Sequence, residues 1–276
     1  MGHKYQIHLI SDSTGETLDR IFVALKSQFL NFDYEKKEHI FIRTESQIDK
    51  IIEESKKKNS IILYTIVETK LAKYISHRCD EKKIPNFSIL GNLMLNFSKL
   101  LNKRATHTPS AQHVLDEDYY KRIEAIQFSI THDDGMRVEN IKEADIILLG
   151  VSRTSKTPTS IYLANRGYKT LNIPLIENQK IPKILMEKPN DYCVVGLNVE
   201  AQRLCDIRTN RLETMNEDRI ANYSDLDFIQ NEIANSKKLF KKYNWPVIDV
   251  TRKSVEETAA SVIRIFDIKK EKKKWN

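Results

Sequence analysis

The chain contains few of the residues that cross-link a protein. Only three of its 276 residues are cysteines, and Cys79, Cys193 and Cys205 are widely spaced, with no CxxC motif and no Cys/His cluster. This pattern argues against a disulfide framework and against a structural zinc site. A chain of this length buries a sizeable apolar core without such cross-links. We therefore expect a protein of the reducing cytoplasm.

Long apolar runs are absent as well. The sequence has no stretch of about 18 consecutive apolar residues, the length that crosses a bilayer as a helix. Its first residues, MGHKYQIHLISDSTGE, lack the basic segment and following apolar stretch of a secretory signal. These absences predict a soluble globular protein without a membrane partner.

Glycine is scarce, and positive charge is unevenly distributed. With 7 glycines in 276 residues, each position that uses this permissive residue is informative. The chain has 45 Lys and Arg against 38 Asp and Glu, and the excess is concentrated in a C-terminal run of Lys269, Lys270, Lys272, Lys273 and Lys274. Lysines without interleaved arginine, glycine or aromatic residues are typical of a solvated chain end, so we expect no nucleic-acid partner. A regulator that binds RNA through this tail is the alternative.

Short apolar runs alternate with amphipathic stretches in the first part of the chain. The runs at 7–10, 39–42, 60–67 and 86–90 predict strands, and helical patterns occupy about 17–29, 46–57 and 70–82. This alternation predicts a parallel sheet with helices on its faces. Ligands of such sheets bind beyond the carboxyl ends of the strands.

A second alternating series follows the turn-forming segment ATHTPSAQHVLDEDYY. It predicts strands at 144–150, 169–175, 191–199 and 245–251, and helices near 119–127, 158–166, 201–216, 225–243 and 254–269. We therefore predict the α/β class with two α/β domains of mostly parallel sheets. The predicted N-terminal domain spans 1–104 and the C-terminal domain spans 105–276.

The strongest local signal is the segment GVSRTSKT, which follows the apolar run of the strand predicted at 144–150. It matches the phosphate-binding pattern GxxxxGK[ST], except that Ser155 stands in place of the second glycine. Pro158 directly after it is typical of the first turn of a helix. Backbone amides at such a strand-to-helix junction wrap a phosphate group, and the helix N-terminus adds positive potential. The C-terminal domain is thus predicted to carry a P-loop-like strand-loop-helix.

Side chains of this loop have distinct predicted roles. Lys156 neutralises phosphate oxygens, Arg153 adds a forked cation, and the Thr157 hydroxyl reaches Mg²⁺. The alternative is a plain turn that matches a short pattern by chance. On the phosphate-binding interpretation, the candidate binding residues are Gly150, Val151, Ser152, Arg153, Thr154, Ser155, Lys156 and Thr157.

A comparable junction lies near the N-terminus, where SDSTGET follows the apolar run 7–10. Its hydroxyls, its glycine and the helix start after it suit an anion. They suit equally a capped helix with Ser13 or Thr14 as its N-cap and Glu16 or Thr17 in its first turn. The sequence leaves both interpretations open.

Carboxylates and a histidine later in the chain are candidates for proton transfer or metal binding. In the segment THDDG, His132 and Asp134 suit a general base or Mg²⁺ ligands, although Asp133 and Asp134 also fit an ordinary turn. Asp249 follows an apolar run, so it is a candidate Mg²⁺ ligand together with Thr157. A plain strand-end residue is the alternative for Asp249.

Arginines recur between residues 203 and 219. Arg208 and Arg211 are three residues apart and therefore share one helical face. Forked hydrogen bonds to phosphates are one role for this group. Solvated ion pairs with Glu213 or Asp206 are the alternative. The group consists of Arg203, Arg208, Arg211 and Arg219.

Several of these motifs occur together, in the same order, in one protein family. The chain resembles the pyruvate, phosphate dikinase regulatory protein family, to which the phosphoenolpyruvate synthase regulatory proteins are related. The resemblance spans nearly the whole chain. It rests on SDSTGET (11–17), THTPSAQHVLDEDYYKRIEAIQF (106–128), THDDG (131–135), ADIILLGVSRTSKTPTSIYLANRGYKTLNIPL (144–175), PVIDVT (246–251) and SVEETA (254–259).

The resemblance implies a bifunctional enzyme that acts on pyruvate, phosphate dikinase. Family members transfer a phosphoryl group from ADP to a threonine of the dikinase, which inactivates it and releases AMP. They remove the group by phosphorolysis, in which inorganic phosphate attacks and pyrophosphate leaves. The resemblance also implies that residues 150–157 hold ADP and that the chain forms a homodimer. The Thr154-Ser155 pair is similar to the dikinase branch, because the synthase branch tends to carry Cys-Gly there.

Phosphoryl transfer needs in-line positioning and neutralisation of developing charge. Lys156 and Arg153 are the predicted catalytic cations, and Mg²⁺ is expected at Thr157. Two other functions compete with this prediction, namely the same chemistry on phosphoenolpyruvate synthase and a P-loop kinase that phosphorylates a small molecule with ATP. The candidate bases for the target threonine are Asp134 and His132, with Asp249 and Asp12 as rivals.

Overall fold

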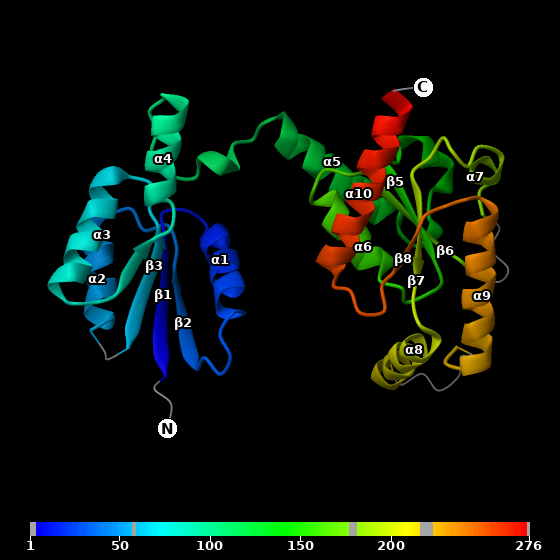
Figure 1. The fold of residues 1–276 in the computed structure, drawn as a ribbon, viewed down its shortest axis with the longest axis horizontal. Helices are drawn as coiled ribbons and strands as arrows, with labels where there is room; N and C mark the ends of the chain where they lie inside the picture. The colour runs from blue at the N-terminus through cyan, green and yellow to red at the C-terminus, as the bar shows by residue number, and fades with distance from the viewer. Residues whose placement is uncertain (1–3, 57–58, 177–180, 216–222, 275–276) are drawn as a thin grey trace. The chain divides into compact units, whose positions relative to one another are not determined.

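The structure, a computed structural model, describes residues 4–56, 59–176, 181–215 and 223–274. The chain divides into two compact units, Met1–Val114 and Leu115–Asn276 (Figure 1). Each unit contains a four-stranded parallel sheet with helices packed on it, which confirms the predicted class of two α/β domains. Within the first unit, the segment 105–114 is held by hydrogen bonds such as that from Ser110 to Ser13 Oγ at 3.0 Å.

The N-terminal unit has the strand order β2-β1-β3-β4. Alternate side chains of its central strand enter two cores, Ile10 with the helices α2 and α3 and Leu9 with α1. The elements are β1 (Tyr5–Ser11), α1 (Glu16–Lys26), β2 (Tyr34–His39), α2 (Glu45–Glu54), β3 (Ser60–Thr65), α3 (Thr69–Glu81), β4 (Asn86–Ser88), α4 (Gly91–Leu101) and the 3-10 helix η1 (Ala111–His113).

The C-terminal unit repeats this topology with the strand order β6-β5-β7-β8. Its helices are α5 (Glu117–Thr131), α6 (Lys156–Ala164), α7 (Lys183–Glu187), α8 (Ala201–Met215), α9 (Leu226–Lys242) and α10 (Val255–Lys274), with the 3-10 helices η2 (Asp133–Gly135) and η3 (Val138–Glu143). Its strands are β5 (Ile146–Gly150), β6 (Thr170–Pro174), β7 (Val194–Asn198) and β8 (Val247–Asp249).

The central strand β5 is buried along its whole length. Ile146 and Leu148 enter one core, whereas Ile147 and Leu149 enter the other. Parallel strands covered by helices on both faces have this continuous apolar character, because neither face meets water. The sequence IILLG therefore places its carboxyl end, Gly150, at the rim of a rigid sheet.

Both sheets have a switch point beside their first strand. β1 lies between β2 and β3, and β5 lies between β6 and β7. In each sheet the second strand along the chain therefore pairs on one side of the first strand, and the third strand pairs on the other side. Open α/β sheets bind ligands in the crevice at the carboxyl ends of such strands. In this protein those ends lead into the two polar junctions singled out in the sequence, 11–16 and 150–156.

One predicted strand was misplaced. The apolar run 39–42 was predicted as a strand, but β2 is Tyr34–His39, a mostly polar segment that pairs with β1. Because β2 is an edge strand, its outward side chains meet water, and charged residues at an edge also discourage pairing with other chains. Phe41 adopts a φ of 53° and its amide binds the Ser13 carbonyl, so the apolar run is a loop that covers the end of β1.

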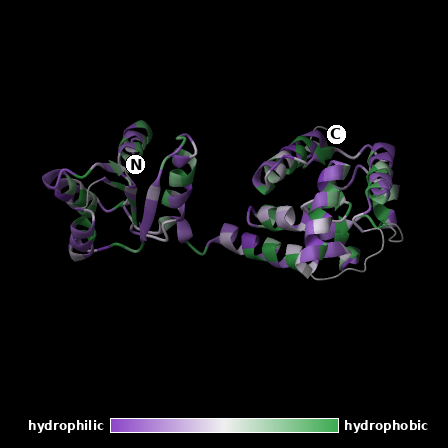
Figure 2. Ribbon diagram, turned by 90° about the horizontal axis from the view of Figure 1, so that it is seen from below, coloured by the Kyte–Doolittle hydropathy of each residue, from purple (hydrophilic) through white to green (hydrophobic). Residues whose placement is uncertain are grey.

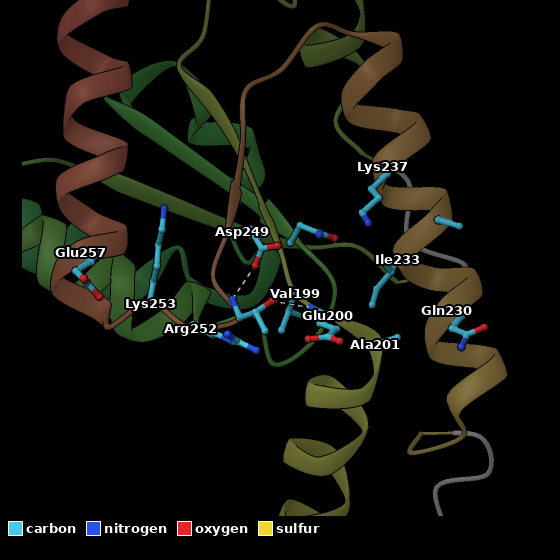
Figure 3. Close-up of a pocket in the computed structure, with 13 residues that line it drawn as sticks. Val199, Glu200, Ala201, Gln230, Ile233, Lys237, Asp249, Arg252, Lys253 and Glu257 are labelled. Carbon is cyan, nitrogen blue, oxygen red and sulfur yellow. Dashed lines mark hydrogen bonds between the residues drawn. The ribbon is translucent and has the colours of Figure 1, made fainter.

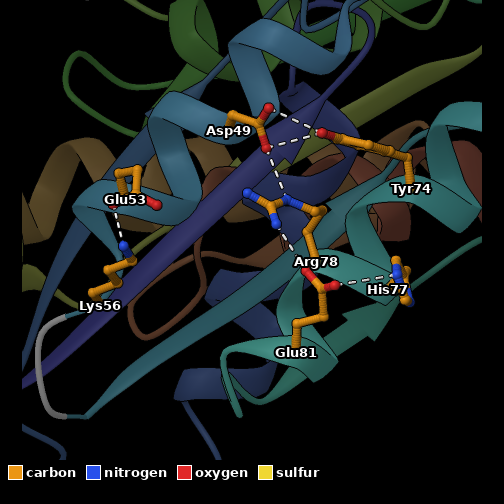
Figure 4. A network of polar contacts seen from close by, with 7 residues as sticks. All are labelled: Asp49, Glu53, Lys56, Tyr74, His77, Arg78 and Glu81. Carbon is orange, nitrogen blue, oxygen red and sulfur yellow. Dashed lines mark hydrogen bonds and ion pairs between the residues drawn. The ribbon is translucent and has the colours of Figure 1, made fainter.

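Polar contacts connect the surface sides of α2 and α3 (Figure 4). Arg78 pairs with Asp49 at 2.9 Å and with Glu81 at 2.7 Å, and Tyr74 donates a hydrogen bond to Asp49. The Tyr74 hydrogen bond and the Arg78 guanidinium lower the pKa of Asp49. These groups are partly exposed, so burial of the apolar sides of the two helices contributes far more to stability than the ion pairs do. Figure 2 shows the corresponding mixture of hydrophilic and hydrophobic residues along the helices.

In the part of the chain that the structure describes, every helix is too short or too polar to span a bilayer. The three cysteines, which all lie within the described residues, form no disulfide, and Cys79 and Cys193 are buried in the cores. Burial raises the pKa of the Cys79 thiol to about 12.

Candidate active site

The loop between β5 and α6 forms a tight turn at the rim of the C-terminal sheet. Arg153 and Ser155 take left-handed backbone conformations, with φ of 71° and 58°. Ser155 is the N-cap of α6 and provides no side-chain cap, and within the described residues the amides of Lys156 and Thr157 donate to no protein acceptor. Free amides at a helix start with positive potential suit an anion.

Gly150 is required by close packing. A Cβ atom at this position would lie 2.7 Å from the Leu197 carbonyl oxygen and 2.7 Å from Thr154 Oγ1. The start of the loop therefore lies closely against Leu197 of β7 and against Thr154 of the loop itself. Ser155 occupies a left-handed position that the P-loop pattern gives to glycine, and serine adopts this conformation at some cost in strain.

Lys156 is buried beneath the loop. Its side chain is 5% exposed, and Nζ donates a hydrogen bond to the Val151 carbonyl at 2.9 Å. Burial lowers the pKa of Lys156 to about 8, against the opposing influence of Asp134 and Asp133. An anion bound at the loop would supply the negative charge that this ammonium lacks.

Asp133 joins the loop to the neighbouring strand. Thr157 Oγ1 donates to Asp133, with distances of 3.1 and 3.0 Å to the two carboxylate oxygens, and Asn172 of β6 donates to Asp133 Oδ1. Asn172 Nδ2 also lies 3.2 Å from Thr157 Oγ1. A hydroxyl and a carboxylate side by side are ligands that Mg²⁺ prefers. The sequence predicted Thr157 as a site residue, favoured a turn for Asp133, and gave no signal for Asn172.

His132 and Asp134 flank Asp133 in very different environments. The His132 ring is buried, stacks on Phe128, and its Nδ1 lies 2.7 Å from the Phe128 carbonyl, which only a protonated nitrogen contacts favourably. Its Nε2 therefore accepts the hydrogen bond from Asn140 at 3.1 Å. Asp134 is exposed with a φ of 50°, and it is the foremost carboxylate acting on Lys156. The geometry makes His132 a support of the turn and Asp134 a free carboxylate near the lysine.

Arg208 is a buried residue of α8 that donates a hydrogen bond to the backbone of the loop. The side chain is 1% exposed, pairs with Glu232 at 2.7 Å and donates to the Ser152 carbonyl at 3.2 Å. The predicted solvated pairing with Glu213 or Asp206 is therefore wrong for Arg208, because α9 lies over it and supplies a partner from another helix. Arg203 and Arg211 are exposed, and Arg219 lies outside the described residues.

Arg153 extends from the loop to Tyr223, which lies in the segment between α8 and α9. Its Nε donates to the Tyr223 hydroxyl at 3.2 Å, and the Tyr223 ring also packs over the Arg208 guanidinium at 4.8 Å. Glu232 and Tyr223 carry no motif in the sequence. Their positions beside Arg208 and Arg153 depend on how α8 and α9 pack.

A cavity of about 900 Å³ opens at the carboxyl ends of β7 and β8 (Figure 3). Asp249 lines it and accepts a hydrogen bond from the Thr251 amide at 2.9 Å. The Thr251 side chain and, after it, this amide lower the pKa of Asp249. Lys237 and Lys253 lower this pKa further. Asp249 is on β8, separated from β5 by β7, whereas Thr157 contacts Asp133. In the described ranges, no three His, Cys, Asp or Glu side chains form a group able to hold a metal ion.

These residues define a class of site. A parallel α/β sheet with free amides at a strand-to-helix loop, a buried lysine and a carboxylate beside a hydroxyl is suited to binding phosphate groups. The sequence model of the kinase/pyrophosphorylase family matches residues 7–263, and the chain belongs to this family.

Curated relatives agree with this assignment. A Pelagibacter ubique protein is 62% identical over 98% of this chain and 99% of its own length, and an Erythrobacter litoralis protein is 44% identical over 96% and 95%. Both are named, provisionally, as pyruvate, phosphate dikinase regulatory proteins. A solved sugar-alcohol-bound solute-binding protein from Agrobacterium vitis covers 94% of this chain and 99% of its own, at 10% identity and a TM-score of 0.25, which is too low to inform the fold.

Proposed function

We propose that the protein is an ADP-dependent protein threonine kinase and phosphate-dependent phosphorylase that regulates pyruvate, phosphate dikinase. Membership of the kinase/pyrophosphorylase family supports a phosphotransferase, and the names of the relatives support the dikinase as partner. The observation that carries the proposal is the buried Lys156 ammonium beneath a loop with free amides. This arrangement suits the phosphates of a nucleoside diphosphate.

In the kinase direction, the threonine oxygen of the dikinase attacks the β-phosphorus of ADP. The bond from that phosphorus to the bridging oxygen breaks, and AMP leaves. Lys156 and Arg153 neutralise the charge that develops on the phosphoryl oxygens, and the threonine proton passes to Asp134. His132 holds the turn that presents Asp134.

In the reverse direction, an oxygen of inorganic phosphate attacks the phosphorus of the phosphothreonine. The bond to the threonine oxygen breaks, pyrophosphate forms, and Asp134 returns a proton to the threonine. Residues 150–157 hold the diphosphate in both directions, as ADP or as pyrophosphate. Mg²⁺ would be held by Thr157 with Asp133, and when bound it would spread the charge of the phosphates. The role of Asp249 as a ligand of this Mg²⁺ ion stays a prediction.

Mass spectrometry of the reaction tests the proposal. We expect purified protein, ADP, Mg²⁺ and pyruvate, phosphate dikinase to give one phosphothreonine on the dikinase and one AMP for each. Phosphoenolpyruvate synthase in a parallel reaction should remain unlabelled. Efficient phosphorylation of a metabolite by ATP, with no labelling by ADP, would instead favour the small-molecule kinase.

We further propose that the enzyme is a cytoplasmic homodimer. The small number of cysteines, none of which forms a disulfide, supports the compartment. Sedimentation velocity of the purified chain should show a species of twice the chain mass at micromolar concentration.

A further inference from the structure

The N-terminal unit has a small polar cavity at the carboxyl ends of β1 and β3. Its volume is about 160 Å³, and it is lined by the β1–α1 junction, the end of β3 and the segment 108–112. The position corresponds to that of the loop 150–157 in the other sheet, because both follow the first strand at a switch point. Six hydroxyl side chains line it: Ser11, Ser13, Thr17, Thr65, Thr108 and Ser110.

The helix that starts at this cavity has no side-chain cap. Gly15 is the N-cap of α1, with a φ of 81°, so the predicted capping by Ser13 or Thr14 is wrong. Their hydroxyls contact Ser110 and His113 instead. A Cβ atom on Gly15 would lie 3.0 Å from an Ile40 methyl group, so glycine lets Ile40 pack closely against the start of α1.

Among the lining hydroxyls that make no side-chain hydrogen bond to the described residues, that of Thr65 belongs to a buried residue. Thr65 is 6% exposed, and its Oγ1 makes no hydrogen bond to any of the residues that the structure describes. The oxygen is open to the cavity, because it is not among the fully buried side-chain atoms that lack a hydrogen-bond partner. A ligand with acceptor oxygens in the cavity would satisfy this hydroxyl.

One acidic and one basic side chain, Asp12 and Arg43, lie at or beside the cavity. The Asp12 carboxylate accepts the Val67 amide at 2.8 Å, so it is engaged with the backbone, and burial raises the pKa of Asp12. Arg43 does not itself line the cavity but contacts two residues that do: Nε donates to the Asp12 carbonyl at 3.3 Å and Nη2 to Ser110 Oγ at 3.4 Å. The guanidinium compensates the carboxylate and adds donors suited to phosphate oxygens.

We propose that this cavity is a second phosphate site, which binds a phosphoryl group as inorganic phosphate or as the phosphate monoester of a protein side chain. Amides at a helix start, a set of hydroxyls and a guanidinium match the three acceptor oxygens of such a group. Pockets for drug-sized ligands measure roughly 300–1,000 Å³, so a cavity of about 160 Å³ suits a small group and excludes a nucleotide.

Titration of the full-length protein carrying Lys156→Ala tests the site apart from the C-terminal loop. Inorganic phosphate and O-phosphothreonine are the probes, followed by amide shifts in ¹⁵N spectra and by calorimetry. We expect saturable shifts at residues 11–17. Binding should weaken about tenfold with Arg43→Gln and roughly fivefold with Thr65→Val, as expected for one charged and one neutral hydrogen bond. The control Arg20→Gln, on the exposed side of α1, should bind normally.

The two probes identify the source of the group. Equal affinity for both assigns the site to free phosphate, and at least tenfold tighter binding of O-phosphothreonine assigns it to a phosphorylated side chain. The same spectra of the wild-type chain repeat the test without any substitution. No saturable shift at residues 11–17 with either probe, or affinity unchanged by both Arg43→Gln and Thr65→Val, would overturn the proposal. Titration with ADP reports on the C-terminal loop separately, so the two sites succeed or fail independently.

Discussion

At the scale of single residues, the buried ammonium of Lys156 decides how the site responds to its ligand. The side chain is held against the Val151 carbonyl, and burial lowers its pKa to about 8. In the unfolded chain this pKa is close to 10.4. The unfolded state therefore binds more protons between pH 8 and 10, so this residue makes the unliganded protein more stable as pH rises through that window.

ADP affinity should show the opposite trend. A bound diphosphate favours the charged lysine and raises its pKa, so binding takes up a proton above pH 8 and weakens as pH rises. The expected loss approaches tenfold per pH unit, measured by calorimetry from pH 7 to 10. Lys156→Arg keeps its charge and should show a flat profile if it folds and binds. A steep decline retained in that variant would assign the titration to another group.

Asp133 offers a second test at this scale. Asp133→Asn removes the charge beside Thr157 while keeping a group able to hydrogen-bond to it. We expect Mg²⁺-dependent ADP binding to weaken about 10- to 100-fold, as for other groups that support a metal site, and Mg²⁺-free binding to change little. Asp249→Asn is the matched comparison. The larger effect in Asp249→Asn would restore Asp249 as the metal ligand.

The sequence predicted Lys156 because its spacing from Gly150 follows a phosphate-loop pattern. Asp133 was not predicted as a site residue, because Asp-Asp-Gly is also a common turn and nothing local shows which carboxylate faces the loop. Asn172 lies within a buried strand, where it looks like an interruption of an apolar run. Its contact with Asp133 depends on β6 pairing beside β5, which sequence spacing does not specify.

At the scale of elements, the loop 150–157 depends on the pair of helices α8 and α9. Arg208 of α8 donates to the Ser152 carbonyl and pairs with Glu232 of α9. Removing one partner of a buried pair leaves an uncompensated charge. Arg208→Met should therefore lower the free energy of unfolding by about 3 kcal/mol, measured by urea denaturation, and should weaken ADP binding.

Arg208→Met with Glu232→Met separates the two effects. The double variant should regain most of the stability, because no buried charge is left without a partner. ADP affinity should stay low, since the Ser152 carbonyl still lacks its donor. Full recovery of affinity would show that Arg208 supports the helices rather than the loop.

Strand and helix types were predicted well where hydrophobicity was strong and least well at the edge. The apolar run before Gly150 predicted β5, whose five residues are all buried, and Pro158 marked the helix after it. β2 was misplaced because its polar, half-exposed sequence has little strand character, whereas the apolar loop beside it does. Edge strands are defined by their pairing partner more than by their own residues.

At the scale of the whole molecule, two units share one topology and place a polar junction at the same point of each sheet. The C-terminal lysine run is part of α10, which extends to Lys274, and Lys269 binds the Tyr192 carbonyl. The lysine run is therefore helical through Lys274.

Removing residues 271–276 tests whether that end has a role of its own. We expect unchanged ADP binding and dikinase phosphorylation, because Lys269 and its contact remain. Gel-shift assays with RNA should show no binding before or after truncation. RNA retention that disappears with these residues would support the RNA-binding alternative.

A crystal structure with ADP and Mg²⁺ tests the central claim most directly. We predict the β-phosphate at the amides of Lys156 and Thr157, with Nζ of Lys156 moved from the Val151 carbonyl to a phosphate oxygen. Well-occupied ADP bound elsewhere, with Nζ still on that carbonyl and the loop amides without a ligand, would contradict the account.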